Sequence, residues 1–390
     1  MTDQAFRIYE QALSEQHSRN EARRIRTRVS EARGRPHAAG VRWPFELMQN
    51  ALDSGPRQGN ESVAIRIRRQ PSGVVFEHDG APFTSVELAA LLSGGSSKDF
   101  ESDVTTGRFG TGFLVTHVLA ERVRLQGLLD VGDHFEQFHL VLDRSGNEEN
   151  ILQNIFACNA AIRAATSLEA NPRVQSATFE YSIPEGSTTF TAGFEALTRA
   201  LPYLYGTRPT LGRIEIESED GCIEIWSSDP LASQSFREGY LQCRSITIER
   251  SRAPTRKLDV FRFMTTPEAH AAALLAVEHV GGAPTVLVPD LQTPRVFRDY
   301  PLRGATFVPL NFILDGKFEP DQERSGLLMG DKDKALLQDA LNAAVLGVRY
   351  ALERCWSGMH LLASTRVPST VFDPSSGERF FIQPRHRIIE

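Results

Sequence analysis

A long segment rich in glycine, serine, threonine and charged residues, 93–112, is the feature that most limits what this chain can fold into. The apolar run 113–120 follows it directly and predicts a helix that begins at a glycine. Long connections in compact domains are usually lids or binding loops. We therefore expect the surrounding fold to be built around a binding site at this segment.

The end of this segment has the composition of a phosphate-binding loop. It reads Gly107-Arg108-Phe109-Gly110-Thr111-Gly112-Phe113. Glycines let the backbone come close to phosphate oxygens, and the N–H groups at the start of the next helix favour negative charge. The lysine and hydroxyl residue of a P-loop are missing, and no βαβ unit with a ribose-binding acid follows. Lys98 either reaches a phosphate from the same segment or is a solvated lysine.

Three polar side chains share one side of a helix predicted to begin near Trp43-Pro44 and to end at Ser54. Glu46, Asn50 and Asp53 lie within about 60° of one another around its axis. An amide oxygen can ligate Mg²⁺, and a carboxylate can polarise a water for attack on a γ-phosphate. A surface amphipathic helix shows the same polar stripe, so this helix alone does not decide its function.

Two predicted strands, 63–69 and 74–78, lead into the turn His78-Asp79-Gly80. A carboxylate at a strand end, followed by a glycine turn, can accept a hydrogen bond from an adenine amino group. Asp-Gly is also a common pair in surface turns. This second motif is therefore as ambiguous in isolation as the helix before it.

Taken in order, the three motifs resemble the N, G1 and G2 boxes of the GHKL ATPases, the superfamily of gyrase, heat-shock chaperones, histidine kinases and MutL. The matching residues are Glu46-x3-Asn50-x2-Asp53, the Asp-Gly turn after a strand, and Gly107-x2-Gly110-x-Gly112-Phe113. The resemblance implies ATP and Mg²⁺ as ligands. It also implies a Bergerat-type α/β sandwich in which a mixed sheet is backed by helices.

The resemblance assigns a role to each matched position. Glu46 would be the general base, Asn50 the magnesium ligand, and Asp53 a ribose contact or a water-mediated contact to the base. Residues 107–113 would hold the phosphates beneath a lid of about 92–109. A threonine on a late strand would bond the adenine-reading carboxylate, with Thr178 as the candidate and Thr188 and Thr189 as substitutes.

The second motif departs from the family pattern, which is Asp-x-Gly-x-Gly. When Gly80 is aligned with the first glycine of this pattern, His78 occupies the position of the adenine-reading aspartate. Pro82 then occupies the position of the second glycine. Either Asp79 reads the base from a shifted register, or His78 does so through a ring nitrogen, or base selectivity is lost. We favour Asp79, because a carboxylate accepts strongly from an amino group.

Within the superfamily, the closest resemblance is to sacsin-like and bacterial heat-shock-chaperone-like proteins. It rests on residues 78–84, on the Ser-Ser-Lys segment ending at Lys98 and on the 107–113 loop, and extends weakly to 307–324. In such relatives the second domain lends a basic residue to the γ-phosphate. Arg324 is the candidate and Lys317 the second choice, although a surface salt-bridge arginine fits Arg324 equally.

The length of 390 residues predicts two domains. We expect an α+β chain with an ATP-binding domain over 1–200, a transducer-like or middle-like α+β domain over 201–360, and a tail or further element over 361–390. In the second domain, the composition predicts helices at 267–279 and 332–354 and strands at 245–249, 259–264, 284–289 and 305–314.

Charge and composition limit which partners the chain can be expected to bind. The net charge is -6, which gives no overall attraction to nucleic acid or to acidic membranes. The N-terminal arm 1–42 is locally basic and could touch nucleic acid or an acidic partner, but a solvated helix and linker is the favoured interpretation. No apolar run suits a membrane span, no secretory signal is visible, and the four cysteines have no metal-ligand spacing, which favours the cytoplasm.

The resulting functional expectation is an ATP-hydrolysing conformational switch that forms a transient or stable homodimer. The branch resemblance suggests a chaperone-like role in a bacterial stress or anti-phage defence system, with an unidentified protein client. The alternative is a nucleotide-sensing scaffold that binds ATP without significant turnover and recruits a protein or nucleic-acid partner. Glu46 favours hydrolysis, whereas the altered turn at Asp79 favours the scaffold.

Overall fold

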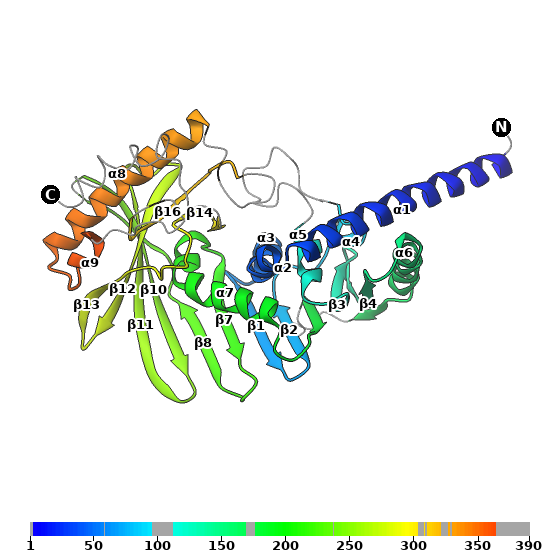
Figure 1. Ribbon diagram of the computed structural model, residues 1–390, viewed down its shortest axis with the longest axis horizontal. Helices are drawn as coiled ribbons and strands as arrows, with labels where there is room; N and C mark the ends of the chain where they lie inside the picture. Colours follow the sequence, from blue (N-terminus) through cyan, green and yellow to red (C-terminus); the bar gives the residue numbers. More distant parts are fainter. Residues whose placement is uncertain are drawn as a thin grey trace. The chain divides into compact units, whose positions relative to one another are not determined.

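The computed structural model describes residues 3–57, 59–95, 112–168, 176–236, 238–302, 308, 310–320, 327 and 330–363. The chain divides into two compact units. Unit 1 comprises residues up to 197 together with 213–223, and unit 2 comprises 198–212 and the chain from 224 onward. Both units combine strands with helices (Figure 1), which confirms the α+β class.

Unit 1 is built on a sheet in the order β7-β1-β2-β6-β3-β4-β5. Its strands are β1 (Val63–Gln70), β2 (Gly73–His78), β3 (Arg122–Asp130), β4 (Phe135–Asp143), β5 (Thr166–Leu168), β6 (Ala177–Ser182) and β7 (Leu211–Glu217). The pairs from β1 through β5 are antiparallel. The alternating segment 63–69 and the segment 74–78 after the turn therefore form neighbouring strands, as predicted.

The two faces of this sheet differ sharply in polarity. One face carries buried rows such as Ile67, Phe76 and Phe179, which lie opposite one another across β1, β2 and β6. The other face carries cross-strand ion pairs, including Arg68–Glu77 at 3.0 Å and Arg124–Glu180 at 3.4 Å. An antiparallel sheet with one packed and one solvated face explains both patterns.

The helices of unit 1 are α1 (Asp3–Gly34), α2 (Pro36–Gly40), α3 (Trp43–Asp53), α4 (Ser85–Ser93), α5 (Gly112–Val115), α6 (Glu148–Arg163) and α7 (Thr188–Thr207), which continues into unit 2. These helices contact the sheet through α3, α4 and α6, and α1 packs on other helices. The helix predicted at 113–120 is only the short α5 and a 3₁₀ turn, Thr116–Val118. Both α4 and α6 begin at a capping box, at Thr84 and Asn147, which fixes their first turns.

Helix α1 has two halves that bury different amounts of surface. In its second half Ala22, Ile25 and Val29 form a buried cluster with Leu114 and α6. Residues 4–17 are all exposed, and the first turns of α1 extend beyond the other elements of unit 1 (Figure 1). At about 100° per residue, the exposed Phe6, Tyr9 and Leu13 lie on roughly the opposite side of the helix from the buried cluster.

Unit 2 contains strands in the order β15-β14-β16-β12-β11-β10-β8, with β13 also paired to β12 and β9 to β10. Their bounds are β8 (Ile223–Ser228), β9 (Ala232–Phe236), β10 (Gly239–Arg250), β11 (Ala253–Met264), β12 (Ala271–Val280), β13 (Ala283–Leu287), β14 (Val296–Arg298), β15 (Tyr300–Pro301) and β16 (Ile313–Gly316). Helix α8 (Asp331–Glu353) packs on β11, β12 and β16, and α9 spans His360–Ala363.

The helix expected at 267–279 is wrong, because this segment forms strand β12. Alanine and leucine favour a helix intrinsically. Here, however, residues 271–277 are fully buried, and β12 is hydrogen-bonded between β11 and β16. A strand buried on both faces needs a continuous apolar run without alternation, and that pattern does not separate it from a buried helix.

We expect deletion of residues 1–17 to leave the midpoint of thermal unfolding of unit 1 nearly unchanged, because residues 4–17 are all exposed and lie outside the buried cluster of α1. By contrast, Ile25→Ala should cost roughly 2–5 kcal/mol, because Ile25 is fully buried. Thermal and urea unfolding of both variants checks this. A deletion as destabilising as Ile25→Ala would contradict the description of α1.

Candidate functional site

Helix α3 is held in place by its apolar side. Trp43 is fully buried and stacks on Phe190 of α7 with ring centroids 5.6 Å apart. Leu47, Met48 and Ala51 are also buried, and Pro44 occupies the first turn, where its missing N–H costs nothing. These buried contacts fix the position of α3 and so of the polar residues on its other side.

Glu46 is buried, not solvated as a surface stripe would be. Only 5% of the residue is exposed, and its Oε1 accepts a hydrogen bond from Arg42 Nη2 at 2.7 Å. Its other oxygen, Oε2, would lie 2.0 Å from a Cβ atom added at Gly112. A side chain at position 112 would therefore displace the Glu46 carboxylate, which lies against the backbone at the start of α5. The first and third motifs are in contact here.

The second motif lies against the other end of α3. A Cβ atom at Gly80 would lie 2.5 Å from Ser54 Oγ and 3.0 Å from the carbonyl oxygen of Ala51. The N–H of Ala81 donates to the Gly55 carbonyl at 2.9 Å. The turn after β2 is thus bonded to the end of α3, and the described parts of all three motifs converge on this helix.

The side chains of Asp79 and His78 have different surroundings. The Asp79 Oδ1 accepts from the Ala64 N–H on β1 at 2.7 Å, so this carboxylate holds the strand as well as the turn. His78 pairs with Ile65 and Ala177 on the apolar face and is only 4% exposed. Its Nδ1 has no hydrogen-bond partner among the residues described by the structure.

The surroundings of His78 keep its imidazole neutral. Burial, reinforced by the positive charge of Arg57, lowers the pKa of His78 to about 4. At neutral pH the ring therefore carries one N–H donor and one acceptor nitrogen.

Arg57 and Ser176 belong to the same cluster, and the sequence did not single out either. Arg57 Nη2 donates to Ser176 Oγ at 2.6 Å, and Ser176 Oγ donates to the Gly80 carbonyl. The Ser176 N–H also donates to the His78 carbonyl at 3.0 Å. The one available sequence signal was position, because Arg57 follows the end of α3 and Ser176 directly precedes β6.

Thr178 does not join this cluster. It lies opposite Glu77 on β2, so its side chain is on the polar face of the sheet, whereas His78 is on the apolar face. The hydroxyl group that bonds the cluster belongs instead to Ser176, which directly precedes β6. Of the substitutes, Thr189 packs against Gly40 at the start of α7, and neither it nor Thr188 has a contact with this turn among those described.

The remaining predicted residues fall into two groups. Asn50 and Asp53 are half-buried on α3, and Asp53 Oδ2 accepts from Gln49 Nε2 at 3.4 Å. Phe113 packs on Phe179, with ring centroids 5.6 Å apart. Outside the described residues lie Lys98, Gly107, Arg108, Phe109, Gly110, Thr111 and Arg324, together with residues 96–109 of the expected lid. Lys317 is described, in unit 2.

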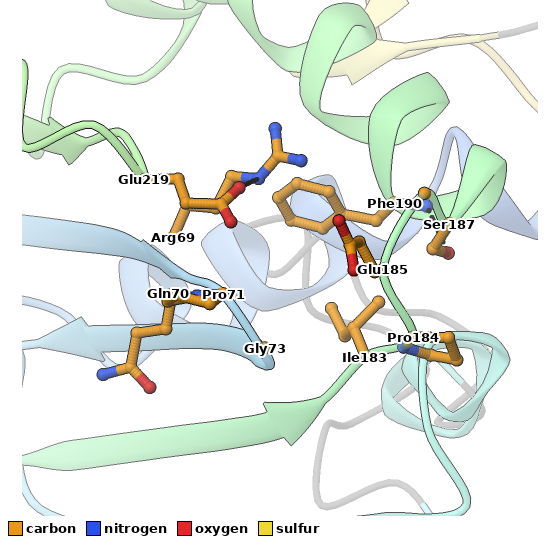
Figure 2. Close-up of a pocket in the computed structure, with 11 residues that line it drawn as sticks. Arg69, Gln70, Pro71, Gly73, Ile183, Pro184, Glu185, Ser187, Phe190 and Glu219 are labelled. Carbon is orange, nitrogen blue, oxygen red and sulfur yellow. Dashed lines mark hydrogen bonds and ion pairs between the residues drawn. The ribbon is translucent and has the colours of Figure 1, made fainter.

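A separate surface hollow lies at the opposite end of the β1–β2 hairpin (Figure 2). It is lined by residues of unit 1 that include Arg69, Gly73, Ile183, Phe190 and Glu219. Arg69 is ion-paired with Glu219 at 3.3 Å and lies 5.1 Å from the centre of the Phe190 ring. None of the residues predicted from the three motifs lines this hollow.

The basic arm is engaged with unit 1 itself. Arg19 pairs with Glu149, and Arg23 and Arg26 pair with Glu148 at the start of α6. These intramolecular pairs support the solvated-helix interpretation for that part of α1. Among the described residues, no helix combines the length and the apolar character that crossing a membrane requires.

We expect the free energy of unfolding to fall as the pH drops from about 7.5 to about 5. The pKa of His78 is lower in the folded state than the ordinary 6.5, so the unfolded chain binds more protons in this window. Its contribution is complete above 6.5 and is lost toward about 4, which removes about 2 kcal/mol by pH 5. His117, with a pKa of about 3, acts in the same direction.

Urea unfolding at the two pH values checks this. His78→Gln should reduce the pH dependence, whereas His139→Gln, at an exposed position on β4, should leave it unchanged. An equal pH dependence in all three proteins would contradict the assignment.

Comparison of the sequence with protein-family models and with curated proteins finds no match to either.

Proposed function

We propose that unit 1 binds a magnesium–nucleoside triphosphate in a Bergerat-type fold, and that the chain is a GHKL-type ATPase. The observation that carries the proposal is the contact between Glu46 and Gly112. It joins the carboxylate of the first motif to the end of the glycine loop. The hydrogen bond from Ala81 to Gly55 joins the second motif to the same helix.

The side chains on α3 fit the chemistry of such a ligand. Mg²⁺ prefers oxygen ligands and keeps several waters, and Asn50 offers a half-buried amide oxygen one turn from Glu46. When bound, the ion would neutralise phosphate charge. The N–H groups at the start of α5 would face the phosphates, and the Glu46 carboxylate would accept a proton from the attacking water.

The ion pair between Arg42 and Glu46 bears on the rate of turnover. The guanidinium of Arg42 donates a hydrogen bond to Oε1, one of the two carboxylate oxygens that could accept a proton from water. Hydrolysis would therefore require this pair to loosen. The pair is the specific observation that favours the second candidate function, a scaffold that binds the nucleotide with little turnover.

The proposed biological role rests on the family resemblance of the sequence. A homodimeric, chaperone-like switch in a stress or defence system is our working proposal, with the nucleotide state controlling a protein client. Such ATPases use turnover as a timer for conformational change.

We expect Glu46→Ala to lower magnesium-dependent phosphate release at least about 100-fold, because the general base is removed, while nucleotide binding persists. A phosphate-release assay and calorimetry measure the two quantities. Glu61→Ala, at an exposed position of unit 1, serves as the matched control. If the wild type binds nucleotide but releases phosphate at the rate of Glu46→Ala, the scaffold function replaces the ATPase.

We expect Asn50→Ala to weaken binding of the magnesium–nucleotide complex roughly tenfold, equivalent to about 1.4 kcal/mol, because one oxygen ligand is lost. Its binding should also lose the dependence on magnesium concentration that the wild type shows. Asn159→Ala, the same change at an exposed position on α6, should bind like the wild type. Unchanged binding by Asn50→Ala would exclude Asn50 as the ligand.

A further inference from the structure

The buried imidazole of His78 is a polar group that the fold does not explain. It is 4% exposed, and its Nδ1 has no partner among the described residues. Buried polar atoms are nearly always hydrogen-bonded, so each exception requires a reason. A ligand that supplies the missing partner is such a reason.

The position of His78 indicates which part of a nucleotide would supply it. Glu46 is in the first turn of α3, and Gly112 of α5 packs against it. The phosphates and magnesium would be held at this place. Gly80, two residues after His78, packs at the last turn of the same helix. At 1.5 Å per residue these two places are separated by about 10 Å along α3. His78 is thus at the end of the site that is remote from the phosphates.

The neighbouring carboxylate, that of Asp79, already accepts a hydrogen bond from the backbone of β1. Asp79 Oδ1 accepts from the Ala64 N–H at 2.7 Å, which fixes the carboxylate toward β1. The other charged group in this cluster is a donor, the guanidinium of Arg57, which bonds Ser176 at 2.6 Å. On the apolar face, His78 is flanked by Ile65 and by the small residue Ala177, which have no polar side-chain atoms.

An imidazole and a carboxylate discriminate differently between bases. A carboxylate only accepts hydrogen bonds, so it suits the exocyclic amino group of adenine and repels the carbonyl oxygen at the same position of guanine. A neutral imidazole has one donor and one acceptor, and the choice of tautomer and ring orientation decides which of them faces the ligand. It can therefore satisfy either base.

We propose that His78 is the base-reading residue and that the site accepts adenine and guanine nucleoside triphosphates without strong preference. The inference rests on the proposed function, since it assumes that unit 1 binds a nucleotide at α3. It changes the substrate class from ATP alone to purine nucleoside triphosphates.

The test is calorimetric titration of the full chain with ATP, GTP and UTP, each with magnesium. The wild type should bind ATP and GTP with dissociation constants within about threefold of each other. His78→Asp should retain ATP and weaken GTP at least about tenfold, because a carboxylate would then face the guanine carbonyl. His139→Asp, the same change on the polar face of the sheet, should leave the ratio as in the wild type.

Two results of the ATP and GTP titrations would each overturn the inference. One is a preference of the wild type for either purine by more than about tenfold. The other is an unchanged ratio in a His78→Asp variant that still folds and binds ATP. If that variant unfolds, His78→Gln replaces it, because an uncharged amide keeps one donor and one acceptor group and should preserve the wild-type ratio; a changed ratio would count against the inference.

Failure of the proposed function has a different signature. If no nucleotide binds the folded wild type, the assignment of unit 1 as a nucleotide site is wrong. Equal binding of UTP would show that the base is not read at all, and would remove His78 from the site while leaving the proposed function intact.

Discussion

The burial of Glu46 is the constraint on which the rest of unit 1 depends. An unpaired carboxylate in this position would be strongly destabilising, because its charge would be removed from water. Arg42, one turn earlier, supplies a charge-assisted hydrogen bond at 2.7 Å. The other carboxylate oxygen is accommodated because Gly112 has no side chain. One polar side chain thus fixes the distance between α3 and α5.

The two-faced sheet decides which other groups can reach this region. Residues on the apolar face of β1, β2 and β6 point toward the helices, and their neighbours in sequence point to the ion-paired face. The side chains of His78 and Asp79 consequently have different surroundings, although the two residues are adjacent in sequence. Thr178, within β6, lies opposite Glu77, whereas Ser176 precedes the strand and bonds the Gly80 turn.

The sequence predicted the elements that carry a clear period. Strand β1 alternates between apolar and polar residues, β2 is a short apolar run after a Pro-Ser-Gly turn, and α3 combines a proline start with a terminating Ser-Gly-Pro. The predictions from sequence failed where tertiary contacts determine the local structure. The run 271–277 has the composition of a helix but lies within a sheet, and the bond between Arg57 and Ser176 joins residues 119 positions apart. Such contacts leave no local pattern.

Helix α1 has a consequence for how the chain responds to proteases and to deuterated solvent. Its second half is anchored by Ala22, Ile25 and Val29, whereas residues 4–17 are all exposed and lie outside this buried cluster. A helix of that length is marginally stable alone in water. Its first turns can therefore unwind without disturbing the remainder of unit 1, so amide exchange and backbone cleavage there proceed independently of global unfolding.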